Sequence, residues 1–206
     1  MKRIVLYLLG LLPLMTVGAA DTPSNSAEAR QVFDKVYEMV FGPQGSTLQY
    51  DVNIIGIYKT HGTIWYKGKK QRFHDERVDT WNDGTTAYMV YRKKKVIEIH
   101  QANSDKKDKY SGKFKFDVND FDYSIETVGN ELFLILKQRK HAKGTVKEAR
   151  VTLDAKTLVP KFVKVKVAFI WAKISISNFK SGGIPDVMFV FPKGVYGSDY
   201  KYVDKR

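Results

Sequence analysis

Residues 80–100 read TWNDGTTAYMVYRKKKVIEIH, with an apolar run on each side of a tight turn and a basic stretch before the next apolar run. The triplet Asn82-Asp83-Gly84 is typical of a hairpin turn, because Gly84 can adopt the positive φ that such turns need. Arg92 to Lys95 lie between two apolar segments, so we expect them in the exposed turn of a second hairpin. This stretch therefore predicts consecutive antiparallel strands.

The rest of the chain repeats this rhythm of short strands and turns, which is typical of an antiparallel barrel or sandwich. The run Leu132 to Leu136 is apolar on both faces, as in a buried strand. Residues 101–122 are irregular, and we expect a short helix or a flap there. Strands are expected at 48–54, 63–66, 72–81, 87–91, 96–100, 123–127, 132–138, 147–153, 162–171, 174–179 and 188–191.

One strong helix is expected at 26–41. Asn25 would cap it, Glu28 stands three residues later as in a capping box, and Gly42-Pro43 would end it. Its apolar stripe recurs at three- and four-residue spacing and consists of Ala29, Val32, Phe33, Val36, Tyr37 and Val40. The predicted fold is mainly β with α (α+β): a single curved antiparallel sheet whose apolar concave side is covered by this amphipathic helix.

The first twenty residues resemble a secretory signal peptide. Lys2 and Arg3 precede an apolar run at 4–17, and Gly18-Ala19-Ala20 offers small residues for cleavage. The alternative is a membrane anchor, but the run is about 14 residues against the roughly 20 that span a bilayer. We expect an exported protein with one domain at 21–206.

Charge and cysteine content limit the partners. The formal net charge is +13, which favours anionic partners or a well-solvated surface, and export argues against nucleic acid. The chain has no Cys, so it has no disulfide and no thiolate metal site. We expect no cofactor, no bound metal, no nucleic acid and no membrane-spanning helix.

Catalytic motifs are missing from the sequence. The four His residues are dispersed, and there is no nucleophile elbow or phosphate-binding loop. His74 lies in the segment RFHDER at 72–77, where we expect a surface charge pattern pairing His74 with Glu76 or Arg72. The clustered acids Asp117, Asp120 and Asp122 are expected in a solvated loop. The sequence therefore favours a protein that is not an enzyme.

Several short segments, in this order, resemble the periplasmic outer-membrane lipoprotein carriers of the LolA family. These segments are GTIWYK at 62–67, RF at 72–73, NDGTTAYMVY at 82–91 followed by Val96, and FVFPKGV at 189–195. The resemblance covers residues 26–200. A departure is Lys67-Gly68-Lys69, where the family often has Lys-Arg-Pro, so the chain resembles a divergent member.

The resemblance implies an open half-barrel covered by a lid helix. It also implies a monomeric carrier that holds the acyl chains of lipoproteins in the apolar concavity. Further implications are a location in the periplasm of a Gram-negative envelope, release machinery at the inner membrane and an acceptor at the outer membrane. We expect Arg72 to latch the lid. The acyl-binding residues expected on the sheet are Trp65, Phe73, Trp81, Tyr88, Leu134, Val165, Val167, Phe169 and Trp171, and those of the lid are Val32, Phe33, Val36, Tyr37 and Val40.

Three alternatives stay open at this point. The interior could be a filled core rather than a cavity, because packed interiors are the norm. The protein could then be an envelope binding or sensor module of the same fold, with a basic surface that meets a partner. A hydrolase acting on envelope polymers would need a nucleophile or metal set that the motifs do not supply.

Overall fold

The structure is a computed structural model that describes residues 24–54, 58–104 and 117–206. The expected signal peptide and most of the irregular stretch 101–122 lie outside the described residues. Within that stretch, the described part includes a short 3₁₀ helix, η4 (Val118–Asp120).

The helix α2 (Ser24–Phe41) is the amphipathic helix that the apolar stripe predicts. It begins two residues earlier than expected, so Asn25 lies inside its first turn and the predicted cap position is wrong. Gly42 ends the helix as predicted, and its N–H donates to the carbonyl oxygen of Glu38 at 2.8 Å. Ala29 and Val40, near the two ends of the stripe, are buried.

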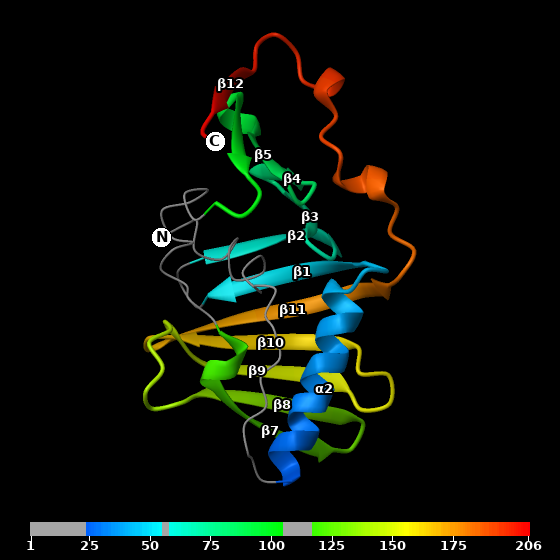
Figure 1. Cartoon of the computed structure of the whole chain (residues 1–206), viewed down its shortest axis with the longest axis vertical. Coiled ribbons are helices and arrows are strands. Elements are labelled where there is room, and N and C mark those ends of the chain that lie inside the picture. Colours follow the sequence, from blue (N-terminus) through cyan, green and yellow to red (C-terminus); the bar gives the residue numbers. More distant parts are fainter. Residues whose placement is uncertain (1–23, 55–57, 105–116) are drawn as a thin grey trace.

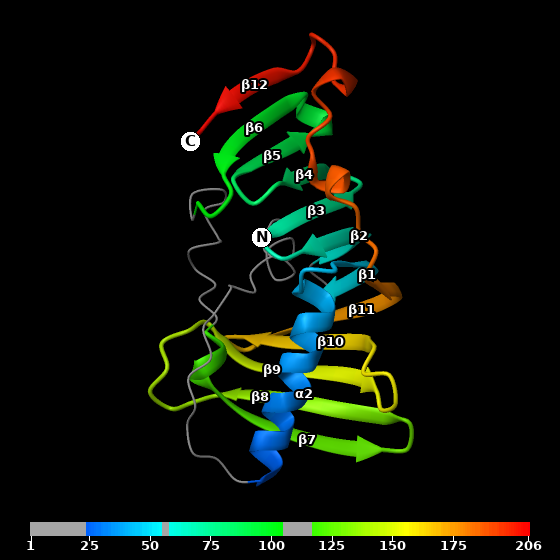
Figure 2. The ribbon, with the colours of Figure 1, turned by 45° about the vertical axis from the view of Figure 1, so that its right-hand side comes forward.

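Twelve strands of the described residues form one open, curved sheet, which confirms the predicted fold class. Their order is β12-β6-β5-β4-β3-β2-β1-β11-β10-β9-β8-β7; β12 pairs in parallel with β6, and every other pairing is antiparallel. Figures 1 and 2 show α2 crossing β7 to β10 and ending beside β1. The strands are β1 (Ser46–Ile54), β2 (Tyr58–Lys67), β3 (Lys70–Asp75), β4 (Val78–Asn82), β5 (Thr86–Tyr91), β6 (Val96–Gln101), β7 (Phe121–Val128), β8 (Glu131–Gln138), β9 (Val146–Asp154), β10 (Pro160–Val167), β11 (Ile170–Ser181) and β12 (Lys201–Asp204).

The turns of the opening stretch form as expected. Asp83 Oδ1 accepts hydrogen bonds from the N–H groups of Thr85 and Thr86, both at 2.8 Å, and Gly84 has a φ of +94°. The basic run forms the 3₁₀ helix η1 (Arg92–Lys94) between β5 and β6. Lys95 follows in the left-handed region. This segment is therefore the turn of the second hairpin.

Three of the predicted strands are wrong. The expected strand 72–81 is the hairpin of β3 and β4, which turns at Glu76 and Arg77. The expected strand 162–171 contains the hairpin of β10 and β11, which turns at Ala168 and Phe169. Neither turn carries the Gly or Pro that usually marks one. The expected strand 188–191 overlaps the 3₁₀ helix η5 (Asp186–Phe189), which Asp186 begins.

The two faces of the sheet follow from the strand registers. Residues directly opposite on neighbouring strands point to the same side, and successive residues alternate. Ile64 lies opposite Leu48 and Phe73, and Val163 lies opposite Ile174 and Val151. These residues share buried clusters with α2, so we call their side the helix face and the opposite side the outer face.

Candidate functional site

The apolar stripe of α2 packs against two clusters on the helix face. Val32 and Phe33 contact the cluster on β7 to β10, Val40 belongs to the cluster on β1 to β4 and β11, and Val36 contacts both. The Phe33 ring lies edge-on to Tyr123, with centroids 5.3 Å apart. The predicted lid side chains therefore lie against the sheet.

Tyr37 joins this aromatic row on the helix. Its ring centroid lies 6.0 Å from that of Phe33 and 4.9 Å from that of Phe41, which in turn lies 4.6 Å from Tyr66 on β2. Burial raises the pKa of the Tyr123 and Tyr66 hydroxyls, so both stay neutral at physiological pH. The Tyr123 hydroxyl donates to the carbonyl oxygen of Val118 at 2.6 Å. These phenols add no charge to the interface.

Hydrogen bonds fix the C-terminal end of α2 to the sheet. Ser46 Oγ donates to the carbonyl oxygen of Val40 at 2.7 Å, and Ser181 Oγ donates to that of Met39 at 2.9 Å. The N–H of Gly68 donates to the carbonyl oxygen of Phe41 at 3.0 Å. Side-chain packing by Ala29, Val32 and Phe33 holds the N-terminal half. The helix is thus anchored at one end.

Four of the predicted sheet residues lie on the helix face. Leu134, Val165 and Val167 contact the same cluster as Val32 and Phe33. Phe73 belongs to the cluster that contains Val40. Leu134 is 1% exposed and Phe73 is 3% exposed, so both positions are filled by packing in this structure.

Trp65, Trp81 and Tyr88 lie on the outer face, away from α2. The registers align Trp65 with Arg72, Arg72 with Trp81, and Trp81 with Tyr88, which places all four on one side. The expectation that they share a face with Phe73 is therefore wrong. The physical reason is parity: Phe73 pairs with Ile64, so its neighbour Arg72 and the neighbouring Trp65 point the other way.

Trp171 and Phe169 also lie outside the helix face. Trp171 pairs with Lys166 on the outer side of β10 and β11. Phe169 stands in the turn between these strands and is 85% exposed. The turn reverses the chain within the stretch that we expected to be one strand. The alternation that would put Phe169 and Trp171 on the same face as Val165 and Val167 therefore stops at Val167.

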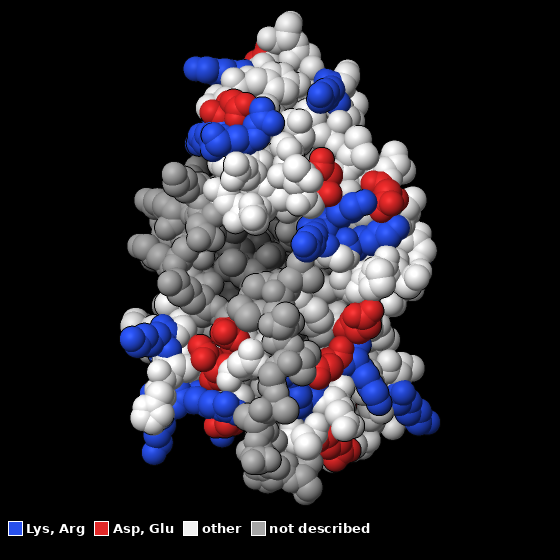
Figure 3. Space-filling model, in the orientation of Figure 1, with Lys and Arg blue, Asp and Glu red and all other residues white. Residues whose placement is uncertain are grey.

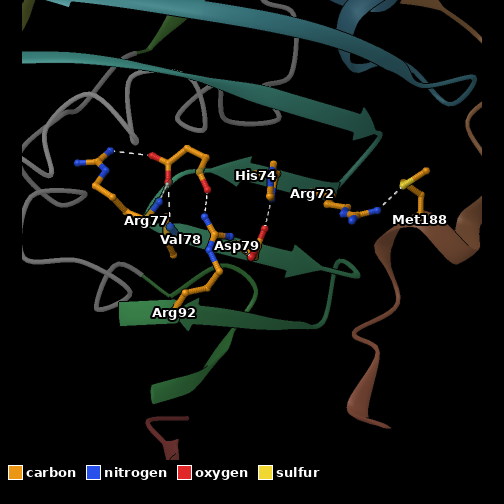
Figure 4. A network of polar contacts seen from close by, with 8 residues as sticks. Arg72, His74, Arg77, Val78, Asp79, Arg92 and Met188 are labelled. Atoms are coloured by element: carbon orange, nitrogen blue, oxygen red, sulfur yellow. Dashed lines mark hydrogen bonds and ion pairs between the residues drawn. The ribbon is translucent and has the colours of Figure 1, made fainter. Parts of the chain in front are cut away.

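Arg72 holds a different segment from the one expected. Its guanidinium carbon lies 4.8 Å from the Trp65 ring centroid and 5.2 Å from that of Trp81, and its Nη1 contacts Met188 Sδ at 2.7 Å. Figure 4 shows Arg72 pointing along the sheet toward Met188. Since α2 lies on the other face, the predicted latch on the lid is wrong.

The segment that Arg72 contacts, residues 182–200, crosses the outer face of β2 to β6, and we call it the C-terminal strap. Asp186 pairs with Lys70 at 3.0 Å and with Lys67 at 3.1 Å. Phe191 stacks on Tyr88 at 4.2 Å and lies edge-on to Trp81 at 5.6 Å. The strap was missed from sequence, although its run of aromatic residues without strand alternation was a usable signal.

A polar network closes the β3–β4 hairpin (Figure 4). Asp75 has a side chain that is 0% exposed and accepts hydrogen bonds from the N–H groups of Arg77 and Val78 at 2.7 and 2.8 Å. Asp79 pairs with both His74 and Arg92. The expected pairing of His74 with Glu76 or Arg72 is wrong, because the register puts Asp79 opposite His74. The network is a structural clamp.

Clustered metal ligands are absent from the described part of the chain. Within 24–54, 58–104 and 117–206 there is no group of three His, Asp or Glu side chains that could hold a metal ion. No helix in these ranges is long and apolar enough to cross a membrane.

Figure 3 shows Lys and Arg interspersed with Asp and Glu on the side of the molecule that α2 covers. What the site offers is apolar contact.

No protein-family model and no curated protein sequence matches the chain. It is similar to the crystal structure of an uncharacterized conserved protein from Thermus thermophilus, with a TM-score of 0.59 and 9% identity over 86% of this chain and 99% of that one. A LolA superfamily protein from Nitrosomonas europaea matches with a TM-score of 0.41 and 10% identity over 80% of this chain and 98% of that one. The lipoprotein LppX from Mycobacterium tuberculosis matches with a TM-score of 0.44 and 9% identity over 80% and 99%. Matches at this identity concern the fold alone, and the Thermus protein shares it over most of both chains.

Proposed function

We propose that this protein is a carrier that binds acyl chains between α2 and the helix face and escorts lipoproteins or similar amphiphiles through the envelope. The observation that carries the proposal is the attachment of α2: hydrogen bonds anchor its C-terminal end, and apolar side chains with the Arg30 guanidinium over the Tyr123 ring hold the rest. Such a helix can lift from the sheet without breaking a hydrogen-bonded ladder. The sequence resemblance to LolA-family carriers supports the same role.

The energetics favour an exchange of contacts. Opening α2 would expose about five apolar side chains, each worth about 1.5–3 kcal/mol when buried. An acyl chain that replaces them gains about 0.8 kcal/mol per methylene, so roughly a dozen methylenes recover about 10 kcal/mol. The two totals are similar, which lets cargo enter and leave without covalent chemistry or ATP at this site.

The delivery route belongs to the same proposal. Lipoproteins are released from an inner membrane and received at an outer membrane, so the carrier would meet release machinery at one and an acceptor at the other. Residues 1–20 would direct export to the periplasm. In this role the protein is a monomer without catalytic activity or a cofactor.

A second candidate is an envelope binding or sensor module whose interior stays packed. It is supported by the helix-face side chains of Ile64, which is 0% exposed, and Leu134, which is 1% exposed. This second candidate predicts that α2 does not move and that acyl chains do not bind.

A fluorescent acyl-chain probe distinguishes the two. The purified protein should bind the probe, and organic extraction followed by mass spectrometry should recover lipid. Val36→Asp should weaken probe binding at least a hundred-fold, because Val36 contacts both helix-face clusters and a charge there would be costly to bury. Gln31→Asp adds the same charge on the exposed side of α2 and should bind normally.

Circular dichroism must show that both variants are folded. If the wild-type protein binds no probe and yields no lipid, the carrier proposal fails and the packed module stands. If Val36→Asp is folded and binds as tightly as Gln31→Asp, the acyl chains do not lie under α2.

A further inference from the structure

Three cations stand side by side on the outer face of β9, β10 and β11. The register places Arg150 directly opposite Lys164, and Lys164 directly opposite Lys173. All three side chains are exposed. Like charges at directly opposed positions destabilise a sheet. The Lys164–Lys173 pair is therefore unfavourable by itself, and a bound anion would relieve the repulsion.

The neighbouring residues leave these cations available. Arg150 pairs with Glu148 at 2.6 Å, whereas Lys164, Lys166 and Lys173 form no ion pair with another described residue. Their long side chains lie instead near aromatic rings: Lys173 Nζ is 4.7 Å from the Phe162 centroid, and Lys166 Nζ is 5.8 Å from that of Trp171. Glu148 also lies directly opposite Lys166, so the excess positive charge of the row is carried by Lys164 and Lys173.

The β10–β11 hairpin ends in an apolar tip close to this row. Phe169 is 85% exposed and Ile170 is 39% exposed. Ala168 has a φ of +53°, in the left-handed region that favours Gly, so the backbone of this turn is strained at Ala168. At about 3.4 Å per residue, Lys166 lies roughly 7 Å and Lys164 roughly 14 Å from Ala168 along the strand.

We propose that this outer surface of β9 to β11 docks on an anionic lipid bilayer, with Phe169 entering the interfacial region and Lys164, Lys166 and Lys173 reaching the lipid phosphates. An exposed Phe beside cations matches an interface that is apolar on one side and negatively charged on the other. A soluble polyanion would use the cations and leave the Phe169 tip in water. The inference concerns the outer face and does not depend on acyl-chain binding under α2.

Vesicle flotation tests the proposal with the purified protein. The protein should float with phosphatidylcholine vesicles that contain phosphatidylglycerol and not with phosphatidylcholine alone. Lys164→Gln combined with Lys173→Gln should weaken association about thirty-fold, since each charge near an anionic surface contributes roughly five-fold. Phe169→Ser should weaken it about ten-fold.

A matched control removes the same charge elsewhere. Lys69→Gln combined with Lys93→Gln changes exposed turns between β2 and β3 and between β5 and β6, and it should leave association nearly unchanged. Thermal unfolding should show that the Lys164/Lys173 variant is at least as stable as the wild type, because it removes a like-charge contact. A loss of binding is then a surface effect.

Three results would overturn the proposal. One is a wild-type protein that does not float with anionic vesicles. Another is an equal loss in both double variants, which would mean attraction by net charge alone. The third is a Lys164/Lys173 variant that loses affinity for heparin but keeps its affinity for vesicles, which would assign the row to a soluble polyanion.

Discussion

Replacing Asp75 by Asn should destabilise the fold by about 2–4 kcal/mol, because the buried carboxylate joins β2, β3 and β4. Its Oδ1 accepts the N–H groups of Arg77 and Val78. Its Oδ2 accepts Arg77 Nη2 at 2.7 Å and Thr60 Oγ1 at 3.3 Å. An Asn side chain keeps one accepting oxygen for the two backbone groups, but its amide cannot accept from the guanidinium.

The magnitude follows from these lost contacts. A hydrogen bond to a charged partner contributes about 1.5–3 kcal/mol, and the Thr60 hydroxyl adds about 1 kcal/mol. Asp75→Ala also strips the acceptor from two backbone N–H groups, so we expect about 3–5 kcal/mol for it. The control is Asp122→Asn: its carboxylate pairs with Arg139 at 2.9 Å but its side chain is 65% exposed, so it should cost less than about 1 kcal/mol.

Urea unfolding followed by circular dichroism measures the three variants. The slope of free energy against urea should stay the same while the midpoint falls for the Asp75 variants. If the free energy of unfolding of Asp75→Asn lies within about 0.5 kcal/mol of the wild-type value, the reasoning is refuted. The hydrogen bonds of the buried carboxylate would then not stabilise the hairpin.

Two further predictions concern the C-terminal strap. Phe191→Ala should remove about 3–5 kcal/mol of packing energy. The Lys201 amide, which donates to the Lys95 carbonyl oxygen at 2.8 Å, should then exchange its hydrogen much faster. The control Val190→Ala, at an exposed position, should leave this exchange unchanged; unchanged exchange in Phe191→Ala would mean that other contacts hold the strap. Hydrogen bonds from Lys70 and, to a smaller extent, from Lys67 lower the pKa of Asp186. The ion pair of Asp186 therefore stabilises the fold above the ordinary carboxyl pKa, and this stabilisation is lost as the pH falls through the lowered pKa. The wild type should therefore unfold at higher urea than Asp186→Asn at neutral pH, and this difference should vanish in strong acid; a difference independent of pH would contradict the ion pair.

The elements that the sequence predicted well are those whose signals are local. The 3.6-residue stripe through Ala29 and Val36 depends only on the helix itself, and Asn82-Asp83-Gly84 carries the conformational preferences of its turn. Both were confirmed. The spacing of turns predicted antiparallel strands but left a barrel or a sandwich open, and the structure has one open sheet.

The face of each strand depends on information that the sequence does not carry locally. A strand's side is set by the number of residues in the turn before it, so a missed turn inverts the predicted face of the next strand. Ala168 and Phe169 form such a turn without Gly or Pro, and this placed Trp171 on the wrong side. Trp65 and Trp81 failed for a related reason: an aromatic residue suits either a lipid-binding face or packing under the strap. Only long-range contacts decide between them, with Phe191 for Trp81 and with Arg72 for Trp65.

The two faces of the sheet are covered differently along its length, and this separates the two proposed activities. On the helix face, α2 packs over β7 to β10, where closure must be reversible for cargo to enter. On the outer face, the strap covers β2 to β6, whereas Lys164 and Lys173 on β10 and β11 are exposed. A bilayer bound at β9 to β11 would therefore lie behind the strands on which α2 rests. Val36→Asp should then abolish probe binding and leave vesicle flotation intact, and the Lys164/Lys173 variant should do the reverse; a single variant that abolished both would mean that the two faces act as one site.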